Sequence, residues 1–138
     1  MFVSVVSVPL AAVAAVLVGF LWYHPRAFGA TWMRAINMTP EMANASRRGT
    51  WLRTLVTLLA ALFAASMLGS IGALEHINDL IGAFGLALGA WAGFVVPPML
   101  GIVLWERKPF SLFLIDALYW LVALAVMAPV LLYFGTFA

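Results

Sequence analysis

Four long apolar stretches constrain this chain more than any other feature of its sequence. They run over residues 2–23, 51–72, 80–105 and 111–134. A helix rises 1.5 Å per residue, so roughly 20 apolar residues cross a hydrocarbon core about 30 Å thick. Backbone N–H groups in hydrocarbon must be paired within the segment, which favours helices, and the short second and third loops make neighbouring helices antiparallel. The sequence therefore predicts an all-α membrane protein with four transmembrane helices in an antiparallel bundle.

The composition agrees with a lipid environment. The 138 residues are 66% hydrophobic and 9% charged, with a mean hydropathy of +1.11, whereas a water-soluble domain is about 45–50% apolar and roughly a quarter charged. Seven basic residues are too few and too scattered for a nucleic-acid face, so no nucleic acid is expected as a partner. The absence of cysteine excludes disulfides and thiolate chemistry. We expect residues 1–138 to form one domain whose main partner is the lipid bilayer.

The longest polar segment, residues 25–50, separates the first two predicted helices. Phe28 and Trp32 are four residues apart and thus share a helical face, which suits a short amphipathic helix lying in the membrane interface. Thr39-Pro40-Glu41 has the pattern of a second helix start, with threonine as N-cap and proline at the first helical position. This second piece is predicted to stop at Gly49.

The basic residues predict the orientation of the chain in the membrane. They lie around the first loop and in the third, at Arg26, Arg34, Arg47, Arg48, Arg53, Arg107 and Lys108. The second loop has no basic residue and carries Glu75 and Asp79. Because Lys and Arg near helix ends stay on the cytoplasmic side, loops 1 and 3 are predicted to be cytoplasmic and both termini to lie outside, as in a multi-pass protein of the cell inner (cytoplasmic) membrane.

Tryptophans mark the three helix ends on the predicted cytoplasmic side. They are Trp22, Trp51 and Trp105. An indole at such a position keeps its ring in the acyl boundary and its N–H in water. We therefore expect all three to act as interfacial anchors.

Asp116 is the charged residue placed deepest in an apolar stretch, about six residues inside the fourth. An acid in hydrocarbon costs about 2.5–3.5 kcal/mol on insertion scales and usually faces the bundle interior. Arg53 and Thr57 share a face of the second helix, and His24 and Tyr23 end the first helix within reach of the same zone. The residues predict an intramembrane polar site, which either moves a proton or cation or only fixes the helix register through a hydrogen bond.

Small residues recur at four-residue spacing on the third helix, at Gly85, Gly89 and Gly93. Helices in lipid associate through close packing of small residues, so this face predicts either packing inside the bundle or a homo-oligomer. The first two helices repeat the pattern at Ala11, Ala15 and Gly19, and at Ala61, Ala65 and Gly69.

Pro97 and Pro98 interrupt the cytoplasmic half of the third helix. Two missing N–H donors and two ring clashes predict a helix kink and free carbonyls one turn earlier. Such carbonyls bind ions in some transporters, but neighbouring helices and waters more often satisfy them.

Reactive motifs are missing from the sequence. It has no nucleophile triad, paired carboxylates, phosphate-binding glycine loop or zinc-protease motif. Glu75, His76 and Asp79 cluster in the second loop, but one imidazole with two acids makes a weak metal site and favours a solvated turn. We therefore expect no enzyme activity, no metal and no cofactor.

Three motifs together resemble a known family. They are Gly19-Phe20-Leu21-Trp22-Tyr23-His24-Pro25 followed by Phe28-Gly29 and Trp32-Met33, then Gly93-Phe94-Val95-Val96-Pro97-Pro98, then Asp116-Ala117-Leu118-Tyr119-Trp120. This pattern covers nearly the whole chain and is similar to the bacterial domain-of-unknown-function 1761 family. The resemblance implies a small four-helix integral membrane protein of a bacterial cytoplasmic membrane, with no assigned activity.

Two functions from different classes remain open at this stage. The small-residue faces favour a non-enzymatic, self-associating structural or accessory subunit, either alone or in a larger membrane complex. The alternative is a small proton- or cation-linked transporter or channel that uses Asp116. A membrane-bound lipid enzyme is the least supported, because no reactive constellation accompanies it.

Overall fold

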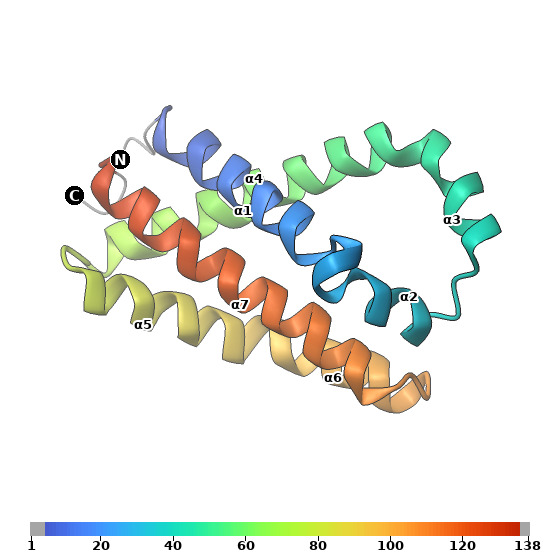
Figure 1. Ribbon diagram of the computed structural model, residues 1–138. Helices are drawn as coiled ribbons and strands as arrows, with labels where there is room; N and C mark the ends of the chain where they lie inside the picture. Colours follow the sequence, from blue (N-terminus) through green and yellow to red (C-terminus); the bar gives the residue numbers. More distant parts are fainter. Residues whose placement is uncertain (1–4, 136–138) are drawn as a thin grey trace.

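The computed structural model describes residues 5–135, and all regular secondary structure in that range is helical. Figure 1 shows the long helices, which are α1 (Ser7–Trp22), α4 (Thr50–Leu74), α5 (Leu80–Ala90), α6 (Val96–Trp105) and α7 (Phe110–Tyr133). The shorter elements are the π-helical η1 (Pro25–Gly29), α2 (Ala30–Ala35), α3 (Pro40–Ser46), the 3₁₀ turn η2 (Arg47–Gly49) and the π-helical η3 (Trp91–Val95). The all-α class is confirmed.

Three described segments are long and apolar enough to cross a membrane: Pro40–Leu74, Leu80–Trp105 and Phe110–Tyr133. A fourth span exists if Ser7–Trp22 and Pro25–Ala35, which meet at a bend of 44°, are taken as one. Residues 2–4 of the first predicted helix lie outside the described range. The fold is thus compatible with a membrane protein of up to four spans.

The segment between α1 and α4 differs in part from the prediction. Thr39 caps α3 as expected, since its Oγ1 accepts a hydrogen bond of 3.2 Å from the Met42 N–H. The predicted stop at Gly49 is wrong. Gly49 has φ −98° and ψ 6°, on the right-handed side of the map, and η2 carries the chain directly into α4. Gly49 lacks the left-handed conformation with which a glycine ends a helix, and Pro40–Leu74 continues as one helical segment of 35 residues.

The core is built on small side chains. Helix α7 lies between α1 and α5, and α1 also packs against α4 (Figure 1). The fully buried residues are mostly alanines, which allow helices to approach closely: Ala11, Ala12, Ala15, Ala61, Ala65, Ala83, Ala87, Ala117, Ala123 and Ala128. The small-residue faces predicted on the first two helices therefore lie inside the bundle.

The glycine face of the third apolar stretch points outward instead. A Cβ added at Gly85, Gly89 or Gly93 would meet nothing within 4 Å. The inward positions of α5 are Ala83 and Ala87, which are buried in the core that α7 shares. The stripe of three glycines, which are spaced four residues apart, therefore faces away from the described part of the bundle.

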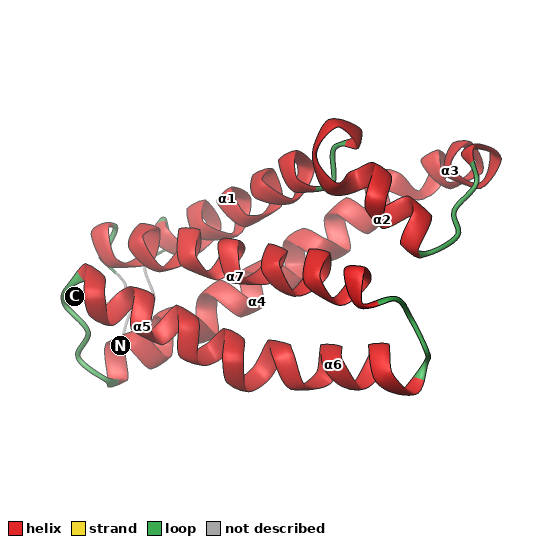
Figure 2. Cartoon of the chain, turned by 60° about the horizontal axis from the view of Figure 1, so that its bottom comes forward, coloured by secondary structure: helices red, strands yellow, loops and turns green. Residues whose placement is uncertain are grey.

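The double proline is preceded by a wide helical turn. Residues Trp91–Val95 form the π-helix η3, and α6 starts at Val96 with Pro97 and Pro98 in its first turn. Leu80–Trp105 still runs as one 26-residue helix, and Figure 2 shows α5 and α6 as one rod beside α7. A π-turn absorbs the donors that proline lacks by shifting the hydrogen-bond register.

The two ends of the bundle differ in charge. Figures 1 and 2 place α2, α3 and the connection between α6 and α7 at one end, which carries the basic residues. The connection between α4 and α5, with Glu75 and Asp79, lies at the other end, where α1 begins and α7 finishes. The two basic segments therefore share one end.

Packing is also uneven along the bundle. The buried residues of α4 all lie between Ala61 and Gly72, and its first eleven residues are not buried. Figure 1 shows this first half of α4 bending away from α7 toward α3, with α2 facing the space between. The core therefore fills the acidic end, and the basic end is left open.

Candidate functional site

A cavity of about 660 Å³ occupies the open end. Residues of α1, η1, α2, α4, α6 and α7 line this cavity, and it is partly open to the surroundings. Its lining is mostly apolar and aromatic with a few polar groups, as is typical of small-molecule sites. The lining residues are Val16, Gly19, Phe20, Tyr23, Gly29, Trp32, Met33, Met38, Thr50, Arg53, Thr54, Thr57, Met99, Asp116, Tyr119 and Trp120.

Asp116 is partly buried in the wall of this cavity and is held by an aromatic donor. The Tyr23 hydroxyl donates a hydrogen bond of 2.6 Å to Asp116 Oδ1, and the Trp32 ring lies against Tyr23 with ring centroids 5.7 Å apart. Tyr23 directly follows α1. A hydrogen bond from a neutral donor stabilises the carboxylate without neutralising its charge.

The backbone on either side of Asp116 is fixed as well. Trp22 Nε1 donates to the Ile115 carbonyl at 3.0 Å, and Trp91 Nε1 donates to the Ala117 carbonyl at 2.6 Å. Three successive residues of α7, 115 to 117, thus accept hydrogen bonds from other elements. The donors are Trp22 in α1, Tyr23 directly after α1 and Trp91 in η3. This arrangement sets the depth and rotation of Asp116 against two neighbouring elements.

Four aromatic rings form a continuous wall beside the carboxylate. Ring centroids are 5.7 Å apart for Trp32 and Tyr23, 5.5 Å for Tyr23 and Tyr119, and 5.4 Å for Tyr119 and Trp120. Tyr119 is anchored by a 3.0 Å hydrogen bond to the Ala15 carbonyl. Gly19 leaves room for it, because a Cβ there would lie 3.2 Å from the Tyr119 hydroxyl.

Arg53 and Thr57 line the same cavity, but Arg53 does not pair with Asp116. Its Nη1 donates to the Ser46 carbonyl at 2.8 Å and to Ser46 Oγ at 2.7 Å, which turns the guanidinium toward α3. Thr50, Thr54 and Thr57 add hydroxyls on the same side. The described residues contain no ion pair between Arg53 and Asp116.

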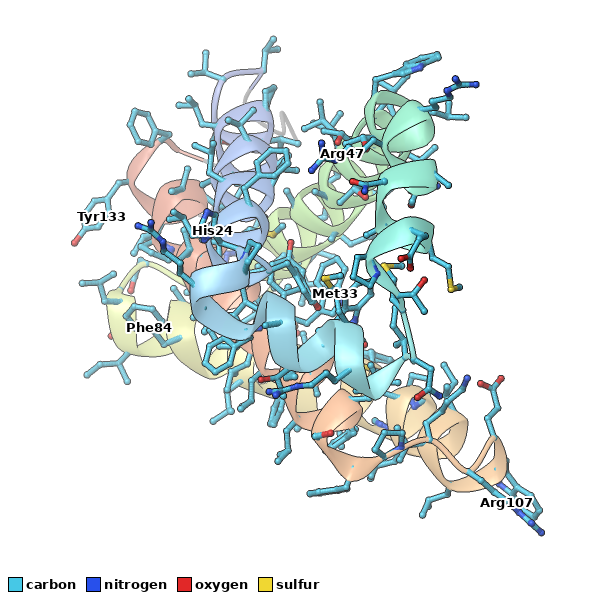
Figure 3. The ribbon with its side chains drawn as sticks, turned by 45° about the vertical axis from the view of Figure 1, so that its right-hand side comes forward. His24, Met33, Arg47, Phe84, Arg107 and Tyr133 are labelled. Carbon is cyan, nitrogen blue, oxygen red and sulfur yellow. The ribbon has the colours of Figure 1, made fainter. Side chains whose placement is uncertain are left out.

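His24 lies outside this site. It is exposed, and its Nδ1 accepts a hydrogen bond of 3.1 Å from the Arg26 N–H, which caps η1. Figure 3 shows Met33 in the space between α2 and α3 and His24 away from it, at the end of α1. Of the four residues predicted for the polar site, the structure brings Asp116, Arg53 and Thr57 to one cavity and leaves His24 apart.

The turn after α1 is what brings Tyr23 and Trp32 together. Gly29 is buried, and a Cβ on it would lie 2.1 Å from the Tyr23 carbonyl oxygen. Only glycine permits this close backbone approach. The turn continues the chain from α1 into α2 at a bend of 44°, which places α2 against α7 and Trp32 in the lining of the cavity.

The three tryptophans predicted as anchors separate into two groups. Trp51 and Trp105 are exposed at the basic ends of α4 and α6. Trp22 is partly buried, contacts Phe28 in a tilted arrangement with ring centroids 4.5 Å apart, and donates a hydrogen bond to α7. The roles of Trp22, Trp32 and Trp91 were not predicted, because a helix-end tryptophan gives the same sequence signal whether it faces lipid or a neighbouring helix.

The helices and the cavity together define a small helical protein whose architecture is compatible with a membrane. Its candidate site lies between the helices of the bundle. The chain belongs to the family described as "Protein of unknown function (DUF1761)", whose profile matches residues 6–132. This confirms the resemblance found in the sequence motifs. No curated protein and no solved structure shows a significant match to the chain.

Proposed function

We propose that this protein is a small, non-enzymatic membrane protein that binds a solute in the cavity beside Asp116 and exchanges it for a proton. The observation that carries the proposal is a carboxylate in the wall of a cavity of about 660 Å³, to which residues 5–135 supply no basic partner. An acid in a transmembrane helix is commonly part of an ion or substrate pathway.

The geometry favours a binding role over a purely structural one. A register-fixing acid needs only a neighbouring helix, whereas Asp116 lies on a space large enough for a small organic molecule. The hydrogen bond to its carboxylate comes from Tyr23, directly after α1, and the short helix α2 contributes Trp32 and Met33 to the lining of the cavity. A short segment of this kind is suited to opening and closing a site.

The proposed setting is a bacterial cytoplasmic membrane with the basic end in the cytoplasm. The positive-inside rule supports this orientation, because both basic segments lie at the end of the bundle that holds the cavity. In this orientation, the cavity opens near the cytoplasmic face. The lipid bilayer is the main partner, and nucleic acid is not one.

Proton exchange is tested in proteoliposomes that contain a pH-sensitive dye. Solutes from four classes, namely organic cations, organic anions, zwitterions and neutral molecules, are added outside. At least one class is expected to change the internal pH with the wild-type protein, and the Asp116→Asn variant should abolish that change. Glu75→Gln is the matched control, because it removes an exposed acid at the opposite end. A response that persists in Asp116→Asn, or no response to any class, would contradict the proposal.

A second function, self-association through the third helix, is favoured by the outward glycine stripe. A Cβ added at Gly85, Gly89 or Gly93 would meet no described atom within 4 Å, and glycines at this spacing allow helices from two copies to pack closely. Such a contact would serve a homo-oligomer or a larger membrane complex.

The self-association is tested by the size of the protein in mild detergent. Gly89→Leu is expected to reduce an oligomer to the monomer, since the added side chain separates the two backbones. Ala60→Leu adds similar bulk on an exposed position of α4 and serves as the control. An oligomer of unchanged size in Gly89→Leu would exclude this face as the interface.

A further inference from the structure

We infer that the solute bound beside Asp116 is an organic cation with an apolar or aromatic body. This inference rests on the proposed function and narrows it to one chemical class. It follows from the combination of one carboxylate, a wall of aromatic rings and a cavity much larger than a metal ion.

The aromatic wall is the first reason. Trp32, Tyr23, Tyr119 and Trp120 line the cavity in a row, with neighbouring centroids between 5.4 and 5.7 Å apart. The faces of such rings carry negative potential and attract quaternary and other organic ammonium groups. The same negative ring faces repel an anion.

The charge of the lining is the second reason. Asp116 lines the cavity with Tyr23 as a neutral hydrogen-bond donor to its carboxylate. Arg53 is the one basic residue of the described lining, and its Nη1 is bound to Ser46 on α3. Among the described residues Arg53 forms no ion pair with Asp116, so a cation beside the carboxylate meets a negative charge that is not neutralised by a direct basic partner.

The remaining lining fits the body of such a ligand. Phe20, Met33, Met38 and Met99 supply apolar and polarisable surface around the aromatic wall. Methionine adapts to ligands of different shape. A compact inorganic ion would leave most of this surface without contacts and finds a single carboxylate rather than the several oxygen ligands that it needs.

Binding should also depend on pH in a defined direction. A proton on Asp116 removes the charge that attracts the cation, so acidification weakens binding. The titratable and charged groups that line the cavity with this carboxylate are Tyr23 directly after α1, Tyr119 from its own helix and Arg53 from α4. Arginine stays charged throughout and a tyrosine hydroxyl stays neutral near pH 7, so Asp116 is the group that changes.

The test uses calorimetric titration of the full-length protein in lipid nanodiscs. The probes are benzyltrimethylammonium, the similarly shaped anion phenylmethanesulfonate and neutral benzyl alcohol. Only the cation is expected to bind. Asp116→Asn should weaken its affinity at least tenfold, and Trp120→Leu should weaken it about three- to tenfold, as the loss of one cation–π contact does. Lowering the pH of the wild-type protein should weaken the binding without any substitution.

Glu75→Gln and Trp105→Leu are the matched controls, because both residues are exposed and outside the cavity. Their affinities should equal that of the wild type. If Asp116→Asn does not fold, the Trp120→Leu variant and the wild-type pH series still decide the matter. Tighter binding at low pH, or equal affinity in Trp120→Leu, would overturn the inference.

The probes separate this inference from the proposed function. If the neutral probe binds and drives Asp116-dependent proton release while the cation does neither, the chemical class is wrong and the exchange function stands. If only the anion binds, proton exchange at Asp116 fails as well, because a bound anion favours the protonated carboxyl. If no probe binds and no solute changes the internal pH of proteoliposomes, both fail.

Discussion

The Tyr23 hydroxyl donates a hydrogen bond of 2.6 Å to Asp116 Oδ1, although the two residues are 93 positions apart in the chain. The same region of α7 accepts hydrogen bonds from Trp22 and Trp91 through the backbone of Ile115 and Ala117. Because the donors of these hydrogen bonds all lie outside α7, the position of the Asp116 carboxylate depends on how α1 and η3 pack against α7.

Replacing Tyr23 by phenylalanine should lower the free energy of unfolding by about 1–2 kcal/mol. The variant keeps the ring but removes the donor to a partly buried carboxylate, and hydrogen bonds to charged groups are worth about 1.5–3 kcal/mol when well shielded. Denaturant titration in micelles measures the change. Tyr133→Phe is the control, since Tyr133 is 70% exposed. Equal stability of the Tyr23→Phe variant and the wild type would show that the bond contributes nothing.

Replacing Gly29 by alanine should displace α2 and cost about 1–3 kcal/mol, in the range of other overpacking substitutions. The new Cβ would lie 2.1 Å from the Tyr23 carbonyl oxygen. This oxygen belongs to the backbone, so it cannot move aside as the end of a flexible side chain can. A Met33→Cys background reports the displacement, because the chain has no other cysteine. Faster thiol labelling at this position is expected with Gly29→Ala. Gly89→Ala, where a Cβ meets nothing within 4 Å, should leave the rate unchanged.

Replacing His76 by glycine should stabilise the protein by about 0.5–1 kcal/mol. His76 follows α4 with φ 54°, a left-handed conformation that disfavours any residue with a Cβ. The neighbouring Glu75 has φ −82°, so Glu75→Gly gains nothing and should destabilise the protein slightly. Thermal unfolding of the two variants in the same detergent measures the difference. A lower melting temperature for His76→Gly than for Glu75→Gly would contradict the expectation.

The charge difference between the two ends predicts a labelling pattern across the membrane. Single cysteines at Asn44 and Glu106 lie at the basic end, and one at Glu75 lies at the acidic end; all three positions are exposed. A membrane-impermeant maleimide should label the first two from one side only and the third from the other side only. Labelling of Asn44→Cys and Glu106→Cys from opposite sides would exclude the predicted topology.

The apolar stretches alone determined the helical class and the approximate helix positions. Their length and continuity force internally paired backbone, and local signals such as Thr39 act within a few residues. The depth of Asp116 likewise marked it for a polar partner, because an unsatisfied acid in hydrocarbon is costly.

Only the tertiary structure decided which partner Asp116 has and which faces are buried. The sequence made Arg53 and His24 candidates by depth, but Arg53 binds Ser46 and His24 caps a local turn, since nearby backbone groups compete for both side chains. The alanines of α1 and α4 and the glycines of α5 look alike as small-residue repeats. Their different burial follows from how α7 lies between its neighbours, which is a property of the assembled bundle and not of any single helix.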